Sequence, residues 1–255
     1  MHSFLRSARG GRTCSRRTFS LFTLCLACLL LVTGCSLPWQ NTTASSGLGP
    51  EPTAQQVLAA MQKNFRLVIS FHLTMKTDNL GNTDGSQIVI RDADGDVLMP
   101  DKIRAQASVL LSGQAVSINL ISVGGNQFIT DPITGQWRVV KGMFDPRALT
   151  NPDTGLIALA SKLQNVTGPV ADSANNLACW RVSGQLPAQD LAFFTGGGVP
   201  TGTLLATTIW VGQADGLPYK ITVVGQAAKG DTAQTARTFL ISKYNESISI
   251  VAPQV

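Results

Sequence analysis

The residues that could carry chemistry are few beyond position 35. The chain holds two histidines and five cysteines, and only His72 and Cys179 follow residue 35. A catalytic triad or a zinc site needs several such side chains held together, and neither residue has a second histidine or cysteine beside it. We therefore interpret His72 as a surface residue on the polar side of a strand and Cys179 as a buried structural thiol. The sequence predicts no catalytic residue, no metal ligand and no cofactor.

Two glycine-containing motifs could also form ligand sites. Asp92, Asp94 and Asp96 alternate along the chain with Gly95 between the last two, which resembles part of a calcium loop. The glycine and the closing glutamate of such a loop are not at the required spacing, so we prefer a hairpin turn. The three glycines at 196–198 follow a predicted helix rather than open one, which does not suit phosphate binding and indicates a hinge.

Cys35 is the cysteine to which the sequence assigns a role. It ends Val32-Thr33-Gly34-Cys35, which resembles a bacterial lipobox, after an apolar run of 12 residues from Leu21 to Val32. That run is shorter than the roughly 20 residues needed to cross a bilayer. We predict that residues 1–34 are a lipoprotein signal peptide and that Cys35 is diacylated. Residues 35–52, rich in Ser, Thr, Gly and Pro, then form a flexible linker anchored on the extracytoplasmic face of the cell membrane.

The net charge of +5 comes from the leader. Five arginines and no acidic residue lie in residues 1–34, which leaves fifteen basic residues to face fifteen acidic residues in the rest. A neutral domain argues against nucleic-acid binding. Arg16-Arg17 resembles a twin-arginine signal, whereas the very apolar run also suits general secretion, so the export route stays open.

The elements that follow are a helix and then many strands. Thr53 is a plausible N-cap for a helix that ends near Asn64, because Val57, Met61 and Phe65 recur at steps of four. From Arg66 the period changes to two. The strands predicted from this alternation and from the turns between them are 66–77, 103–111, 116–123, 127–130, 137–140, 177–183, 204–211, 219–225 and 238–251.

Helices interrupt this antiparallel meander at two places. One is predicted from Asn151-Pro152-Asp153 to about Gln164 and a short one from Pro187 to Phe194. Three helices are few to cover the apolar face of a sheet of nine or ten strands. Alanines at 105, 107 and 178 on strand faces hint at unfilled space, so the pattern leaves a filled core and an open gap as alternatives.

Several stretches resemble the LppX/LprAFG family of mycobacterial-type lipoproteins over roughly residues 53–253. They are residues 95–104, 124–137, 144–149, 151–156 and 208–211, with sequences GDVLMPDKIR, GGNQFITDPITGQW, FDPRAL, NPDTGL and TIWV. The family resembles the carriers LolA and LolB. The resemblance implies an α+β fold in which a strongly bent antiparallel β-sheet, a half barrel, has helices on its concave face and encloses an apolar cavity.

The resemblance also implies a function and a set of site residues. A domain over 53–255 would bind acyl chains of lipids or lipoglycans, transfer them from the plasma membrane and act as a monomer rather than as an enzyme. A membrane-tethered sensor or adaptor module with the same fold is the alternative. The residues we expect to contact the ligand are Ile69, Phe71, Leu73, Ala107, Val109, Ile118, Leu120, Leu156, Leu159, Leu163, Val182, Ile221 and Val223.

Overall fold

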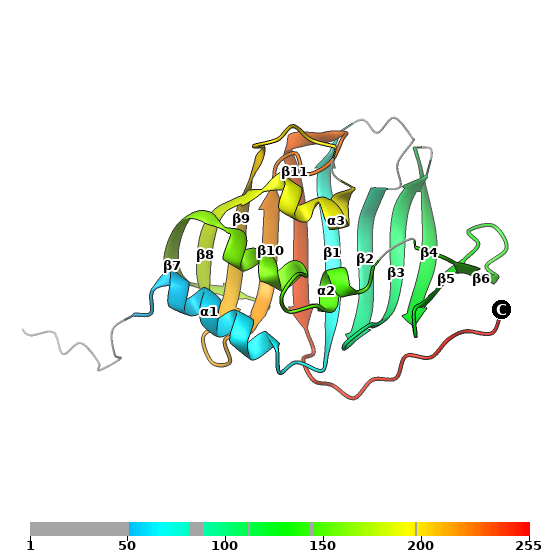
Figure 1. The fold of residues 1–255 in the computed structure, drawn as a ribbon, viewed down its shortest axis with the longest axis horizontal. Coiled ribbons are helices and arrows are strands. Elements are labelled where there is room, and N and C mark those ends of the chain that lie inside the picture. The colour runs from blue at the N-terminus through cyan, green and yellow to red at the C-terminus, as the bar shows by residue number, and fades with distance from the viewer. Residues whose placement is uncertain (1–50, 82–88, 112, 143–144, 197) are drawn as a thin grey trace, which may run out of the picture. The chain divides into compact units, whose positions relative to one another are not determined.

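The chain forms one large antiparallel sheet of eleven strands that is not closed (Figure 1). A computed structural model describes residues 51–81, 89–111, 113–142, 145–196 and 198–255. Residues 49–255 form a compact unit that contains the whole sheet and its core. The strands are β1 (Ser70–Leu80), β2 (Val89–Leu98), β3 (Lys102–Leu111), β4 (Gln114–Val123), β5 (Asn126–Thr130), β6 (Trp137–Val140), β7 (Gln164–Ala174), β8 (Leu177–Pro187), β9 (Leu204–Gly212), β10 (Pro218–Val224) and β11 (Asp231–Ser242).

The strand order joins two meanders side by side. It runs β6-β5-β4-β3-β2-β1-β11-β10-β9-β8-β7, so the first six strands spread one way and the last five return to pair β11 with β1. The helices are α1 (Ala54–Phe65), α2 (Arg147–Thr150), η1 (Leu156–Lys162), η2 (Ala188–Leu191) and α3 (Ala192–Thr195). Figure 1 shows these helices over the half of the sheet from β7 to β1, while the ribbons of β2 to β5 stand clear of them. Among the described residues, no helix is long and apolar enough to cross a membrane.

The first helix forms where the sequence predicted it. The Gln56 N–H donates to Thr53 Oγ1 and the Thr53 N–H donates to Gln56 Oε1, which makes a capping box. Val57, Met61 and Phe65 are buried at steps of four and pack on the sheet. The N-cap and the apolar stripe are therefore confirmed.

The first strand keeps its predicted period but begins later. Phe71 and Met75 are buried, whereas Leu67 and Ile69 are 76% and 60% exposed. The chain turns after α1, where Val68 donates its N–H to the Phe65 carbonyl and is itself buried, so the regular alternation starts only with β1. Ile69, which was predicted to face the ligand, is therefore exposed just before the regular alternation of β1 begins.

The acidic motif at 92–96 lies inside β2, so the predicted hairpin turn is wrong. Asp94 and Asp96 project on the same side as His72, while Ala93, Gly95 and Val97 point to the other face. The small inward residues hid the alternation that a strand requires. Gly95 is needed for the pairing with β3, since a Cβ there would stand 2.5 Å from the Arg104 carbonyl oxygen.

The middle of the chain departs most from the prediction. Instead of one helix over 151–164, Asn151 caps a turn by accepting N–H bonds from Asp153 and Thr154, and η1 follows. Strand β7 was not predicted, because as an edge strand it exposes most of its residues and lacks a regular apolar alternation. The last strand was predicted over 238–251, but the observed strand β11 begins earlier, at Asp231, and ends at Ser242. The chain after β11 has no regular strand and leads to Ile250, which packs on Ile121 and Phe128.

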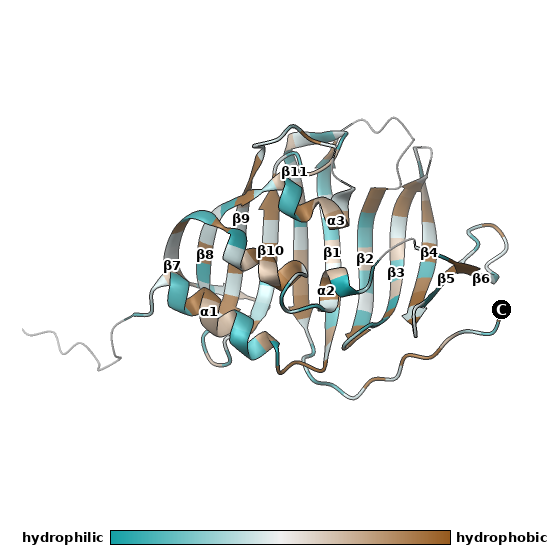
Figure 2. Cartoon of the chain, viewed as in Figure 1, coloured by the Kyte–Doolittle hydropathy of each residue, from teal (hydrophilic) through white to brown (hydrophobic). Residues whose placement is uncertain are grey.

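The core fills one half of the sheet. Phe65 of α1, Leu205 of β9 and Phe239 of β11 are almost wholly buried in a single apolar cluster. Figure 2 shows hydrophobic and hydrophilic residues alternating along the strands, as expected when a sheet has one apolar face. The helices pack on the β7 to β1 half and leave much of the apolar face of β2 to β5 without a helix above it.

Candidate binding cavity

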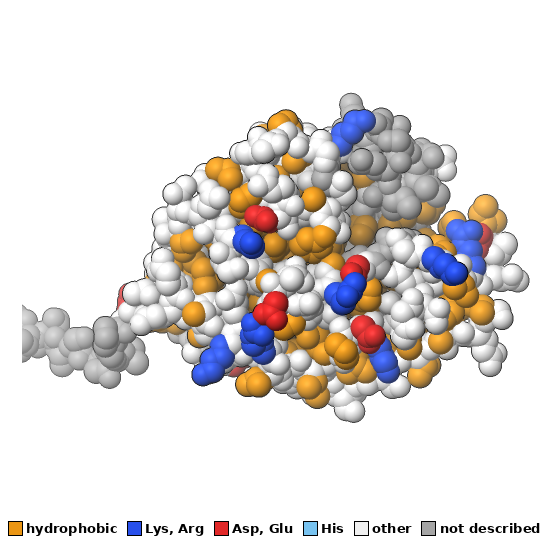
Figure 3. Space-filling model, in the orientation of Figure 1, with side chains coloured by type: hydrophobic (Ala, Val, Ile, Leu, Met, Phe, Trp, Pro, Cys, Tyr) orange, Lys and Arg blue, Asp and Glu red, His pale blue; other side chains and the backbone are white. Residues whose placement is uncertain are grey.

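A cavity of about 650 Å³ lies on the helix-bearing face of the sheet, over β1 to β5. In Figure 3 hydrophobic side chains gather in the hollow to the right of the helix-covered part. Leu149 of α2 and Phe193 and Phe194 of α3 line it on the side of the helices. The apolar strand residues in its wall are Leu73, Met75, Val89, Ile90, Ala93, Val97, Ile103, Ala105, Ala107, Val109, Val116, Ile118, Leu120 and Ile129.

Small residues form the floor of this cavity. Ala93 of β2 is opposite Ala107 of β3, and Gly95 is opposite Ala105. Two neighbouring pairs without a branched or aromatic side chain leave the sheet surface bare at this point. The interpretation of Ala105 and Ala107 as space-making residues agrees with this placement, whereas Ala178 is exposed on β8. The cavity persists because these small residues lie where helices do not cover the sheet.

The structure brings together part of the predicted ligand-contacting set. Five residues line the cavity: Leu73, Ala107, Val109, Ile118 and Leu120. The others except Ile69 pack in or against the filled core under α1 and η1: Phe71, Leu156, Leu159, Leu163, Val182, Ile221 and Val223. Their faces were predicted as apolar, but other side chains of the packed core already fill the space beside them.

Sequence reasoning missed the contribution of the short helix α3. Phe194 packs edge-on against Phe239 of β11, with 5.4 Å between ring centroids, while Phe193 is 43% exposed. Thr195 donates its hydroxyl to the Ala227 carbonyl oxygen at 2.8 Å, which fixes the end of α3 to the β10–β11 connection. The pair of phenylalanines before a glycine run was the available signal for a helix that closes one side of the cavity.

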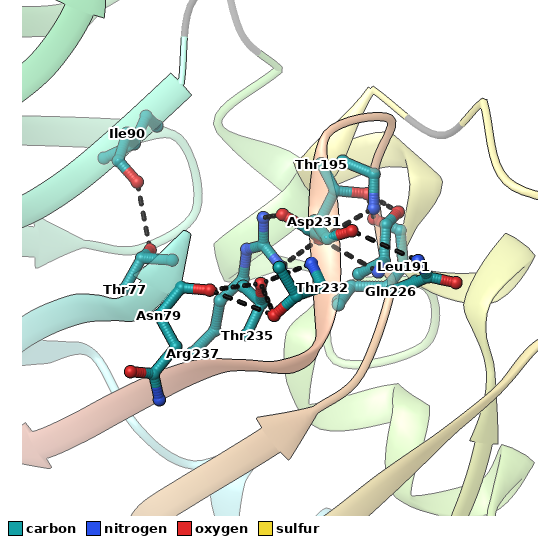
Figure 4. A network of polar contacts seen from close by, with 12 residues as sticks. Thr77, Asn79, Ile90, Leu191, Thr195, Gln226, Asp231, Thr232, Thr235 and Arg237 are labelled. Carbon is teal, nitrogen blue, oxygen red and sulfur yellow. Dashed lines mark hydrogen bonds and ion pairs between the residues drawn. The ribbon is translucent and has the colours of Figure 1, made fainter. Parts of the chain in front are cut away.

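A buried ion pair interrupts the apolar wall. Arg237 donates from Nη1 and Nη2 to the two oxygens of Asp231 at 2.7 and 2.9 Å, and both side chains line the cavity. Asp231 also accepts the backbone N–H groups of Ala227 and Ala228. Figure 4 shows this pair within a network that extends to Thr195 on one side and to Asn79 on the other. This pair could not be predicted from the sequence, because a charged residue in an amphipathic strand is normally expected on the outer face.

Exposed positive charge also lines the cavity, at Arg138 and Lys229. Arg138 Nη1 stands 3.9 Å from an oxygen of Asp131, a loose contact. Hydrogen bonds from the N–H groups of Thr134 and Ile133 lower the pKa of Asp131. Among the described residues of the lining, the exposed charged side chains are these two cations.

The other candidate residues lie away from the cavity. His72 is on the opposite face, where Nδ1 contacts Asp96 at 2.9 Å and Nε2 contacts Asp94 at 3.1 Å. Cys179 is buried, and this burial raises the pKa of its thiol, which disfavours the nucleophilic thiolate. Within the described ranges no group of three His, Cys, Asp or Glu residues could hold a metal ion. Gly196 ends α3 with a φ of 79°. Gly197 and Cys35 lie outside the described residues.

Comparison with known proteins finds a matching family model, related sequences and similar solved structures. The model of the LppX_LprAFG lipoprotein family matches residues 53–250. Lipoarabinomannan carrier protein LprG of Mycolicibacterium smegmatis is 23% identical over 246 residues, which cover 92% of this chain and 95% of that protein. The crystal structure of LprF from Mycobacterium bovis superposes with a TM-score of 0.63 at 20% identity, covering 80% of this chain and 98% of LprF. For LppX from Mycobacterium tuberculosis the TM-score is 0.55 at 16% identity, with 78% and 100% covered.

Proposed function

The chain belongs to the LppX_LprAFG lipoprotein family, and we propose that it binds the acyl chains of lipids or lipoglycans in its apolar cavity and transfers them from the plasma membrane. Family membership confirms the resemblance drawn from the sequence and, with it, the prediction that the chain is not an enzyme. The observation that carries the proposal is the cavity of about 650 Å³ with an apolar, small-residue floor. A relative named as a lipoarabinomannan carrier supports this class of cargo.

The finer description of the fold belongs to the same proposal. We take the open sheet to be bent into a half barrel whose concave side carries the helices and the cavity. In support, Leu73 and Met75 of β1 belong to the packed core and also line the cavity, so core and cavity share one face of the sheet. A concave face would surround a chain on several sides, which a flat sheet does not.

Transfer of an acyl chain requires a site that competes with a bilayer. Each buried CH₂ gains about 0.8 kcal/mol relative to water, so a sixteen-carbon chain gains on the order of 12 kcal/mol in an apolar cavity. A bilayer offers nearly the same free energy. Exchange between cavity and bilayer is then close to neutral, provided that the chain does not pass through water.

A lipid anchor would meet that condition by holding the domain at the bilayer. We propose that Cys35 is diacylated after removal of residues 1–34, and that residues 35–52 connect it to the domain. Residues 1–50 lie outside the described part of the chain, so the proposal is supported by the lipobox-like sequence and by the family. The domain would then act on the extracytoplasmic face of the cell membrane.

The size of the cavity restricts the cargo. Its volume of about 650 Å³ lies within the range of roughly 300–1,000 Å³ that is typical of sites for drug-sized ligands. A lipid with many chains would need more room. We therefore propose that one or two acyl chains enter the cavity and that larger parts of a lipid or lipoglycan stay outside.

Uptake of lipid from vesicles tests the proposed function. A chain that begins at Ser36 keeps the whole compact unit and carries no anchor lipid. After organic extraction to remove lipid, incubation with vesicles and separation from them, mass spectrometry is expected to find lipid bound at about one molecule per protein. Protein that neither co-purifies with lipid nor takes it up would contradict the proposal and would favour the sensor or adaptor hypothesis.

A further inference from the structure

Arg237 is a charged side chain that the apolar cavity does not require. It lies on β11, its side chain is only 5% exposed, and it lines the cavity together with Asp231, whose side chain is 3% exposed. Asp231 also holds the β10–β11 connection, because its Oδ2 accepts the N–H groups of Ala227 and Ala228. Arg237 neutralises this buried carboxylate, and its guanidinium at the same time brings further N–H donors to the wall of an otherwise apolar cavity.

The guanidinium has more donors than Asp231 accepts. An arginine carries five N–H groups, and Arg237 gives one from Nη1 and one from Nη2 to Asp231. Among the residues that the structure describes, no partner is recorded for its Nε–H. Among the described residues this Nε atom does not count among the buried side-chain atoms without a partner, so it is open to the cavity that Arg237 lines, where a ligand can bring an acceptor oxygen to it.

The charge of the site selects the kind of acceptor. The bidentate contact with Asp231 (Figure 4) neutralises Arg237, and both side chains are almost wholly buried. An ionised phosphate or carboxylate beside this pair would add an uncompensated negative charge in a buried place, which is unfavourable. A hydrocarbon chain alone would cover this donor and leave it without an acceptor, which is costly. A neutral carbonyl oxygen satisfies the donor without adding charge.

We propose that Arg237 binds the ester carbonyl oxygen of an acyl lipid whose chain occupies the cavity. This inference rests on the proposed function and adds a chemical class to it: ester-linked acyl chains are preferred to ether-linked or free alkyl chains. Arg237 is a specificity-determining residue in this account, and Asp231 positions it through two parallel hydrogen bonds.

A pair of ligands that differ in one carbonyl group provides the test. 1-Palmitoylglycerol and 1-hexadecylglycerol have chains of matched length, but only the first carries an ester carbonyl. Their dissociation constants for lipid-free protein beginning at Ser36 are measured by calorimetry below their micelle concentrations. We expect the ester to bind about tenfold more tightly than the ether, as for one hydrogen bond to a charged donor.

Variants then assign this preference to Arg237. Arg237→Lys keeps a cation beside Asp231 but loses the planar guanidinium with its several N–H donors. The double variant Asp231→Asn with Arg237→Gln removes both charges together. Both are expected to bind ester and ether about equally, with little change in the affinity for the ether. Arg138→Gln, at an exposed position of the same cavity, is the control and is expected to keep the preference.

The outcomes separate the inference from the proposed function. If the wild-type protein binds both ligands equally, or if the variants keep the tenfold preference, the role of Arg237 is wrong while lipid binding stands. If neither ligand binds, the proposed function itself fails. Tighter binding of the anionic 1-palmitoylglycerol phosphate than of 1-palmitoylglycerol, lost in the double variant but not in Arg138→Gln, would overturn the assignment to a neutral ester.

Discussion

Ala107 shows at the scale of single residues how the cavity stays open. It faces Ala93 across the β2–β3 pair, and both residues end at a Cβ in the floor. A larger side chain here would project into empty space rather than into packed neighbours. The cost that usually follows overpacking of a core should therefore be small at this position.

Ala107→Phe is expected to reduce lipid binding without unfolding the protein. A buried ring takes up space needed by chain carbons, so the lipid bound at saturation should fall by roughly half or more, as measured by mass spectrometry after vesicle uptake. Ala178→Phe, at an exposed strand position, is the matched control. Equal loss in both variants, or no loss in Ala107→Phe, would contradict the placement of the ligand.

Asp96 on the opposite face makes acid stability predictable. Burial by itself would raise its pKa, but hydrogen bonds from His72 and Arg104 outweigh burial and lower the pKa below its usual value. A carboxyl group whose pKa is lower in the folded state stabilises the fold above its unfolded pKa, and this contribution disappears as the pH falls through the folded pKa.

Asp96→Asn should accordingly lower the free energy of unfolding by about 1 kcal/mol at pH 7 and by much less near pH 3. Urea denaturation of both proteins at the two pH values measures the difference. Asp92→Asn, at an exposed position of the same strand, is expected to change little at either pH. A deficit of the same size in Asp96→Asn at pH 3 would refute the role assigned to its ionised form.

Among the elements, α1 stabilises the half of the sheet that does not hold the cavity. Phe65 is 1% exposed and packs against Phe71, with 5.6 Å between ring centroids. Phe65→Ala is expected to lower the free energy of unfolding by about 3–5 kcal/mol while the remaining folded protein binds lipid normally. Chemical denaturation and lipid uptake per folded molecule check this. If lipid uptake per folded molecule fell in Phe65→Ala, the packed half of the sheet would also be needed for lipid binding, and the prediction would be wrong.

Helix α3 has an exposed apolar residue at the cavity. Phe193 lines the cavity and is 43% exposed, as an apolar contact with a bilayer would require. Phe193→Ser should slow lipid uptake from vesicles several-fold and leave the melting temperature nearly unchanged. Val170→Ser, at a residue of β7 that is 48% exposed, is the control, and a similar slowing in that variant would argue against a particular role for Phe193.

The elements also show what can be predicted from sequence. Helix α1, with its apolar stripe from Val57 to Phe65, and the inward faces of β3 and β4 could be predicted because their apolar residues recur at clear periods. Strand β2 was hidden because Ala93 and Gly95 are small, and β7 because an edge strand is largely exposed. Which apolar faces are filled depends on where η1 and α1 pack. Val182 and Ile118 therefore look alike in sequence, although one is core and the other lines the cavity. Arg237 was missed because only tertiary pairing with Asp231 lets it face inward.

At the scale of the whole molecule, the single sheet combines a packed half with an open half. Strands β7 to β11 carry the core under α1, and β1 to β5 carry the cavity, with the β1–β11 pair joining them. Packing in the first half can offset the free energy of unfolding that is lost because the cavity in the other half is unfilled. A carrier needs this combination, because its ligand must enter and leave without unfolding the domain.

A crystal structure of the protein loaded with a palmitoyl lipid tests the central claim most directly. The account predicts electron density for an acyl chain above Ala93 and Ala107, beside Phe194, with the ester oxygen near Arg237. Lipid bound elsewhere on the molecule, or a cavity filled by the protein's own side chains while lipid is demonstrably bound, would contradict it.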